Sequence, residues 1–156
     1  ARSVGYSGPV YMLHTGSWYD TRMERIAGLR LMHWYNVDVI AYDSDSIELA
    51  QLAKTEGRYS ISAKIDGTSL FGESNLASTV YVWNDLFVSF VEAAMHKEKG
   101  QILFHGYDRD AVSLGTLSVH VDAITRLHVA KEIQQFRKGN DTIFCPLEKS
   151  FTVACP

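Results

Sequence analysis

Cysteine and proline are scarce in this chain. Only 2 cysteines and 3 prolines occur among its 156 residues. Cys145 and Cys155 are too few for a disulfide framework, and no Cys/His cluster indicates a zinc site. The histidines show no HxH, HxxxH or HExxH spacing, which leaves metal catalysis without a motif. We expect both cysteines to be reduced, with a bridge between them remaining open if the protein is exported.

Long apolar runs and an excess of one charge are also absent. No stretch of about 18 apolar residues is present, so we expect no membrane-spanning segment. No basic-then-apolar signal pattern opens the chain, and we expect a cytoplasmic location. With 15 basic and 18 acidic side chains the net charge is -3, so the chain as a whole does not attract nucleic acid or anionic lipid.

The composition favours one globular domain over residues 1–156. Hydrophobic residues make up 46% of the chain, which is enough for a core at this length. The first residue is Ala1 rather than methionine. We therefore consider a processed chain or a domain excised from a longer protein.

Short β-like runs alternate with helical patterns along the chain. Strands of this kind, separated by helices, predict βαβ units and a mostly parallel sheet. A short link before the last strand permits only an antiparallel pair there. The predicted fold is therefore an α/β three-layer sandwich with helices on both faces and a C-terminal antiparallel strand pair. The expected strands are 10–14, 37–42, 58–65, 79–83, 101–105, 142–144 and 151–154, and the expected helices are 21–34, 46–56, 87–99 and 121–136.

Polar or glycine-bearing residues follow four of these strands, where open α/β sheets bind ligands. A carboxylate at such a position can accept the hydroxyl protons of a ribose, and a glycine turn lets the backbone approach a ligand. The residues are His14, Thr15, Gly16 and Ser17 after the first strand, Asp43 after the second, Asp66 after the third, and Asn84 and Asp85 after the fourth.

This order of elements resembles the class I S-adenosylmethionine-dependent methyltransferases. The resemblance implies that residues 14–17, Asp43 and Asp66 bind S-adenosylmethionine, and that Asn84 and Asp85 are the catalytic pair that positions the methyl acceptor. Trp18 and Tyr19 follow the glycine turn and can stack on adenine or another base. The acceptor would be a nucleic acid or a small molecule, and a protein partner or a homo-oligomer is also considered.

Each of these residues also has a purely structural explanation. Residues 14–17 can form an ordinary βα turn, while Asp43, Asn84 and Asp85 can cap helices and Asp66 can stabilise a turn. A catalytically inactive methyltransferase-like binding module is therefore an alternative. A further alternative is an N-glycosidase that cleaves NAD or nucleosides, with Glu92 on an apolar helix as its carboxylate.

Overall fold

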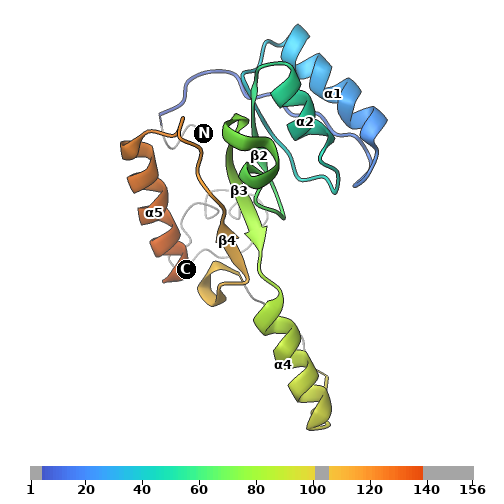
Figure 1. Cartoon of the computed structure of the whole chain (residues 1–156), viewed down its shortest axis with the longest axis vertical. Helices are drawn as coiled ribbons and strands as arrows, with labels where there is room; N and C mark the ends of the chain where they lie inside the picture. Colours follow the sequence, from blue (N-terminus) through green and yellow to red (C-terminus); the bar gives the residue numbers. More distant parts are fainter. Residues whose placement is uncertain (1–4, 101–105, 139–156) are drawn as a thin grey trace, which may run out of the picture.

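The computed structural model describes residues 5–100 and 106–138. Their helices and strands alternate along most of this range, with short 3₁₀ turns labelled η (Figure 1). In chain order the elements are α1 (Thr21–Trp34), β1 (Val39–Ala41), α2 (Glu48–Thr55), β2 (Tyr59–Ser62), α3 (Thr68–Phe71), η2 (Gly72–Ser74), β3 (Asn75–Tyr81), α4 (Asn84–Met95), η3 (Tyr107–Arg109), β4 (Val112–Leu114) and α5 (Ala123–Arg137).

The strands form one sheet in the order β1-β2-β3-β4. β1 and β2 are parallel, with Ile40 opposite Ser60, and β2 and β3 are parallel, with Ser62 opposite Ser78. β3 and β4 are antiparallel, and Val80 faces Ser113. The carboxyl ends of β1, β2 and β3 consequently lie along the same edge of the sheet.

The hydrophobic core is formed where α1 and α2 meet the first two strands. Its buried members are Met32, Ile40, Leu49, Leu52 and Ala53. Gly28 allows the two helices to approach closely, because a Cβ at this position would lie 2.7 Å from a methyl carbon of Leu52. The close approach places the start of α1 next to the loop that leaves β1.

Figure 1 shows α1 and α2 on one side of the sheet and α5 on the other. α4 differs from the other long helices because it extends away from the sheet, and like α5 it has no buried residue. The chain leaves the sheet along β3 and returns along β4, and these two paths are joined by a hydrogen bond from the N–H of Val82 to the carbonyl of Ala111. None of the helices in the described part of the chain is long and apolar enough to cross a membrane.

The predicted α/β class is confirmed: the sheet is mostly parallel, with one antiparallel pair and packed helices. The helices expected at 21–34, 46–56, 87–99 and 121–136 correspond to α1, α2, α4 and α5. The strands expected at 37–42, 58–65 and 79–83 correspond to β1, β2 and β3, although β3 begins four residues earlier, at Asn75.

The expected first strand at 10–14 is wrong. This segment has no regular structure, and Val10 and Met12 are 72% and 75% exposed. A strand needs a neighbouring strand for its backbone hydrogen bonds, and no described strand pairs with this segment. An apolar run alone therefore did not determine strand formation here.

The antiparallel pair of the described sheet is formed by β3 and β4. β4 occupies residues that we did not expect to form a strand, because three residues between turns carry little periodic signal. The strands expected at 101–105, 142–144 and 151–154 lie outside the described residues, as do both cysteines.

Candidate functional site

A hollow of about 390 Å³ lies at the carboxyl ends of the three parallel strands. Consecutive residues line it on two strands, 41–43 and 61–63, because β1 ends at Ala41 and β2 ends at Ser62. Its floor is largely apolar, and Asp43 is the charged residue of its lining. The lining residues are Ala41, Tyr42, Asp43, Ile61, Ser62, Ala63, Thr79 and Tyr81.

Lys64 forms the charged part of this edge. Its ammonium group pairs with the carboxylate of Asp45 and lies 3.6 Å from Asp43 Oδ1. The hydrogen bond to Asp45 raises the pKa of Lys64 above its usual value, although desolvation opposes the shift. The carboxylates of Asp43 and Asp45 raise it further, so Lys64 stays protonated and the three charges sum to one negative charge.

The backbone of Lys64 has a φ of 75°, in the left-handed region that a lysine rarely adopts. Its carbonyl accepts a hydrogen bond from the N–H of Tyr81 at 3.3 Å. A strained backbone beside a cavity is typical of residues held in place for binding. The conformation directs the Lys64 side chain to the carboxylates that follow β1.

Trp18 reaches the same cluster from the segment before α1. Its ring centroid lies 5.1 Å from Lys64 Nζ, a cation–π distance. The carbonyl of Trp18 accepts a 2.7 Å hydrogen bond from the N–H of Asp45. Trp18 is 67% exposed, so its ring remains available to a ligand. We call Trp18, Asp43, Asp45 and Lys64 the edge cluster.

Tyr42 lies between the edge cluster and the core. It lines the hollow and also a smaller cavity of about 90 Å³ beside Asp45 and Lys64. Burial raises the pKa of Tyr42 to about 12, and the negative charge of Glu24 contributes to this shift. The phenol is therefore neutral at physiological pH and can donate a hydrogen bond.

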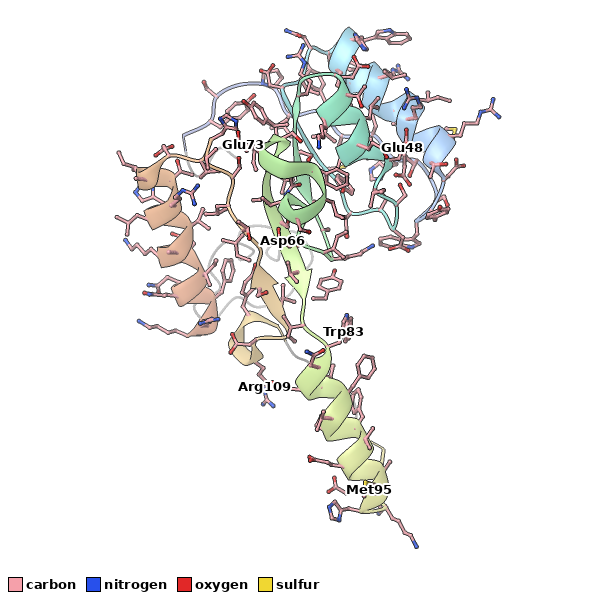
Figure 2. All side chains as sticks on the ribbon, viewed as in Figure 1. Glu48, Asp66, Glu73, Trp83, Met95 and Arg109 are labelled. Carbon is pink, nitrogen blue, oxygen red and sulfur yellow. The ribbon has the colours of Figure 1, made fainter. Side chains whose placement is uncertain are left out.

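Asp66 has a structural environment different from that of Asp43. Its carboxylate accepts hydrogen bonds from the backbone N–H of Thr68 at 3.1 Å and from both the N–H and the hydroxyl of Thr116. Burial alone would raise the pKa of Asp66, but these bonds outweigh it and hold the pKa below its usual range. Figure 2 shows Asp66 beside β3. Its oxygens join two loops of the protein.

Residues 14–17 lie in an irregular segment with bends at 16–19, rather than in a turn after a strand. The hydroxyl of Thr15 donates to the carbonyl of Ser17, and the Ser17 hydroxyl bonds to the backbone of Tyr19. Gly16 has a φ of 73°, which suits glycine. The segment leads to Trp18 and so reaches the edge cluster, but His14, Thr15, Gly16 and Ser17 do not line the hollow.

Asn84 and Asp85 lie in the first turn of α4, and both are exposed. α4 leaves the sheet just after Trp83 and ends at Met95, far from the sheet in Figure 2. No described contact joins this pair to Asp43 or Asp66. Glu92 is also exposed on α4. In the described part of the chain, the structure therefore does not gather the predicted residues into one site. No group of three or more His, Cys, Asp or Glu side chains there could hold a metal ion.

A family model described as ABC transporter substrate-binding protein PnrA-like, Bmp, matches residues 1–143. The chain belongs to this family. No curated protein matches it. A solved structure described as a transcriptional activator of the comK gene from Bacillus halodurans has 23% identity and a TM-score of 0.71, and covers 81% of this chain and 45% of that one. An ABC transporter solute-binding protein from Conexibacter woesei has 15% identity and a TM-score of 0.62, and covers 82% and 44%.

These two structures share the fold of the Bmp-family chain, which spans less than half of their length. The family assignment shows that the methyltransferase resemblance is wrong. Methyl transfer, the inactive methyltransferase-like module and the N-glycosidase interpretation are wrong with it. Alternating strands and helices are common to many α/β families, so their order did not distinguish between them.

The roles given to individual residues depended on that resemblance. The structure does not test S-adenosylmethionine binding by His14, Thr15, Gly16, Ser17, Asp43 and Asp66, or catalysis by Asn84 and Asp85. The cytoplasmic location and the single domain over residues 1–156 also stay predictions.

Sequence reasoning missed Lys64 and Tyr81 as site residues. Lys64 was placed inside the strand expected at 58–65, but β2 ends at Ser62. A lysine between Ala63 and Ile65, just before the turn at Asp66, was the available signal that the strand had ended. Tyr81 lies in the strand expected at 79–83, and nothing in the neighbouring sequence indicates which face of the sheet its side chain occupies.

Proposed function

We propose that this chain binds the transported ligand of an ABC transporter in the hollow at the carboxyl ends of β1, β2 and β3. Open α/β sheets bind ligands at this edge because loops converge there while the strands form a rigid base. The hollow beside the edge cluster carries this proposal, because it combines an apolar floor with a charged rim. Membership of a substrate-binding family supports it.

The lining indicates the chemistry of the ligand. Ala41, Ile61 and Ala63 offer an apolar surface to a flat or aliphatic group. The carboxylate of Asp43 is 63% exposed and can accept hydrogen bonds from hydroxyl or amino groups. Because the edge cluster carries one net negative charge, a neutral or cationic ligand is favoured over an anion.

The hollow is open to solvent on this chain, so the ligand needs a second surface to leave water. Each of the two solved structures is more than twice as long as the part that this chain covers. The rest of each of those chains is available to form such a surface. We propose that the segment that forms this second surface contacts α4, which has no buried residue.

Binding is tested by recording amide chemical shifts of the chain during titration with nucleosides, sugars and amino acids in turn. One class should shift the amides of Asp43, Lys64 and Tyr81 in a saturable way. Asp43→Asn should weaken this binding about tenfold, because a charged acceptor is lost. Asp85→Asn is the matched control, since Asp85 is an exposed carboxylate on α4. Equal weakening by both variants, or saturable shifts only outside the hollow, would contradict the proposal.

A further inference from the structure

Glu24 is a fully buried carboxylate, with 0% exposure, in the first turn of α1. One of its oxygens, Oε1, accepts a hydrogen bond from the N–H of Asp20 at 3.3 Å. Asp20 in turn caps the helix by accepting from the N–H of Met23 at 3.0 Å. This reciprocal arrangement resembles a capping box, in which a side chain of the first turn bonds back to the N–H of the cap residue. Capping alone does not explain why this carboxylate is buried.

The second oxygen of Glu24 contacts a different part of the chain. Oε2 accepts hydrogen bonds from the hydroxyl of Ser44, at 3.1 Å, and from the hydroxyl of Ser46. Ser46 is itself buried, and its oxygen also accepts the N–H of Glu48 at the start of α2. A buried carboxylate is costly unless its oxygens are satisfied, so Glu24 and these serines depend on one another.

The loop held by Glu24 carries the acidic residues of the edge cluster. Asp43 precedes Ser44, and Asp45 lies between the two serines. The N–H of Asp45 donates to the carbonyl of Trp18 at 2.7 Å, and its carboxylate pairs with Lys64. Glu24 therefore ties the segment that carries Trp18 to the loop that carries Asp43 and Asp45.

We propose that Glu24 is a positioning residue for the edge cluster: its carboxylate, through Ser44 and Ser46, fixes the loop that places Asp43 and Asp45 beside Lys64 and Trp18. That these groups then contact a transported ligand rests on the proposed function. The positioning itself does not, because it concerns contacts within the ligand-free chain.

The test compares Glu24→Gln with Glu48→Gln, each in a chain whose only tryptophan is Trp18. Trp34 and Trp83 are 74% and 50% exposed and can be replaced by phenylalanine. Glu48 is a suitable control because its carboxylate joins α1 and α2 through Arg25, at 2.9 Å, without contacting the loop at 44–46 through its side chain. The measurements are hydrogen exchange of the Asp45 amide and the chemical shift of the Trp18 indole.

Glu24→Gln should speed exchange of the Asp45 amide at least about tenfold and shift the Trp18 indole signal, because a neutral amide is a weaker partner for the Ser44 and Ser46 hydroxyls than the one charged oxygen that they share. Glu48→Gln should leave both unchanged. If Glu24→Gln does not fold, Ser44→Ala with Ser46→Ala removes the same contacts from the loop side and should give the same two changes. A folded Glu24 or serine variant with unaltered Asp45 exchange and indole shift would overturn the proposal.

Ligand titration separates the two proposals. A ligand that binds the unmodified chain in the hollow and binds Glu24→Gln with equal affinity overturns the positioning role and leaves the proposed function standing. Altered Asp45 exchange and indole shift in Glu24→Gln, with no ligand of any class bound in the hollow, supports the positioning role and counts against the proposed function.

Discussion

Thr116 donates both its backbone N–H, at 3.0 Å, and its hydroxyl, at 2.7 Å, to a single carboxylate oxygen of Asp66. The two residues are fifty positions apart, so this contact ties the loop after β2 to the segment after β4. The hydroxyl of Thr68 donates to the carbonyl of Thr116 at 3.0 Å and strengthens the same junction.

We expect Asp66→Asn to lower the free energy of unfolding by about 1–2 kcal/mol at neutral pH, because hydrogen bonds to a charged acceptor are weakened. The folded-state pKa of Asp66 lies below its unfolded value. Its contribution is therefore present above the unfolded pKa of about 4 and is lost as pH falls through the folded pKa. Urea unfolding of both chains should show their difference shrinking from about pH 5 to about pH 3. A difference that grows on acidification would contradict this assignment.

Gly67 lies against buried polar side chains, and we expect Gly67→Ala to destabilise the fold. An added Cβ would lie 2.4 Å from Ser62 Oγ and 2.7 Å from Asn75 Oδ1. Relieving this overlap should disturb bonds such as the 2.8 Å contact between Ser62 and Ser78, at a cost of about 1–3 kcal/mol. Gly100→Ala is the control, because a Cβ there meets no atom of the described residues within 4 Å. Denaturant unfolding measures both, and equal stabilities would count against a tightly packed polar layer.

Leu52 is the most deeply buried leucine side chain of the core, at 1% exposure. Leu52→Ala removes its contacts with α1 and leaves a cavity, so we expect a loss of about 2–5 kcal/mol in the free energy of unfolding. Leu70, on α3, is 53% exposed, and Leu70→Ala should cost about 1 kcal/mol or less. Thermal unfolding of the two variants compares these positions directly. A larger loss for Leu70→Ala would show that the core is elsewhere.

The exposed apolar residues of α4 should affect association more than folding. Phe87, Val91 and Met95 are 59%, 59% and 77% exposed and follow one another at helical spacing. Replacing all three by glutamine should change the free energy of unfolding by about 0.5 kcal/mol per site or less. The same change should reduce binding of a hydrophobic dye and self-association, measured by light scattering. A cooperative loss of folding in this variant would show that α4 is packed.

Local sequence signals predicted the helices and several strand ends well. Asp20, directly before α1, is a residue type that caps helices, and its carboxylate accepts the N–H of Met23. α2 begins at Glu48 after Ile47, and Ser46 satisfies the N–H of Glu48 from outside the helix. Such features depend on neighbours within a few residues, which the sequence displays directly.

The candidate site could not be predicted in the same way. The bond of Glu24 to the N–H of Asp20 is local, but its hydrogen bonds to Ser44 and Ser46 span about twenty residues. The left-handed backbone of Lys64 and the contact of its side chain with Trp18 have no local signature. Both depend on how segments that are distant in the sequence pack together.

The sequence by itself determined the α/β class, because the periodicity of apolar residues and the capping chemistry are local properties. Only the tertiary structure decided that residues 10–14 stay out of the sheet, that β4 pairs with β3, and that Asp66 joins two loops. Strand pairing and buried polar contacts depend on which distant segment supplies the partner. That choice is settled by the packing of the whole chain.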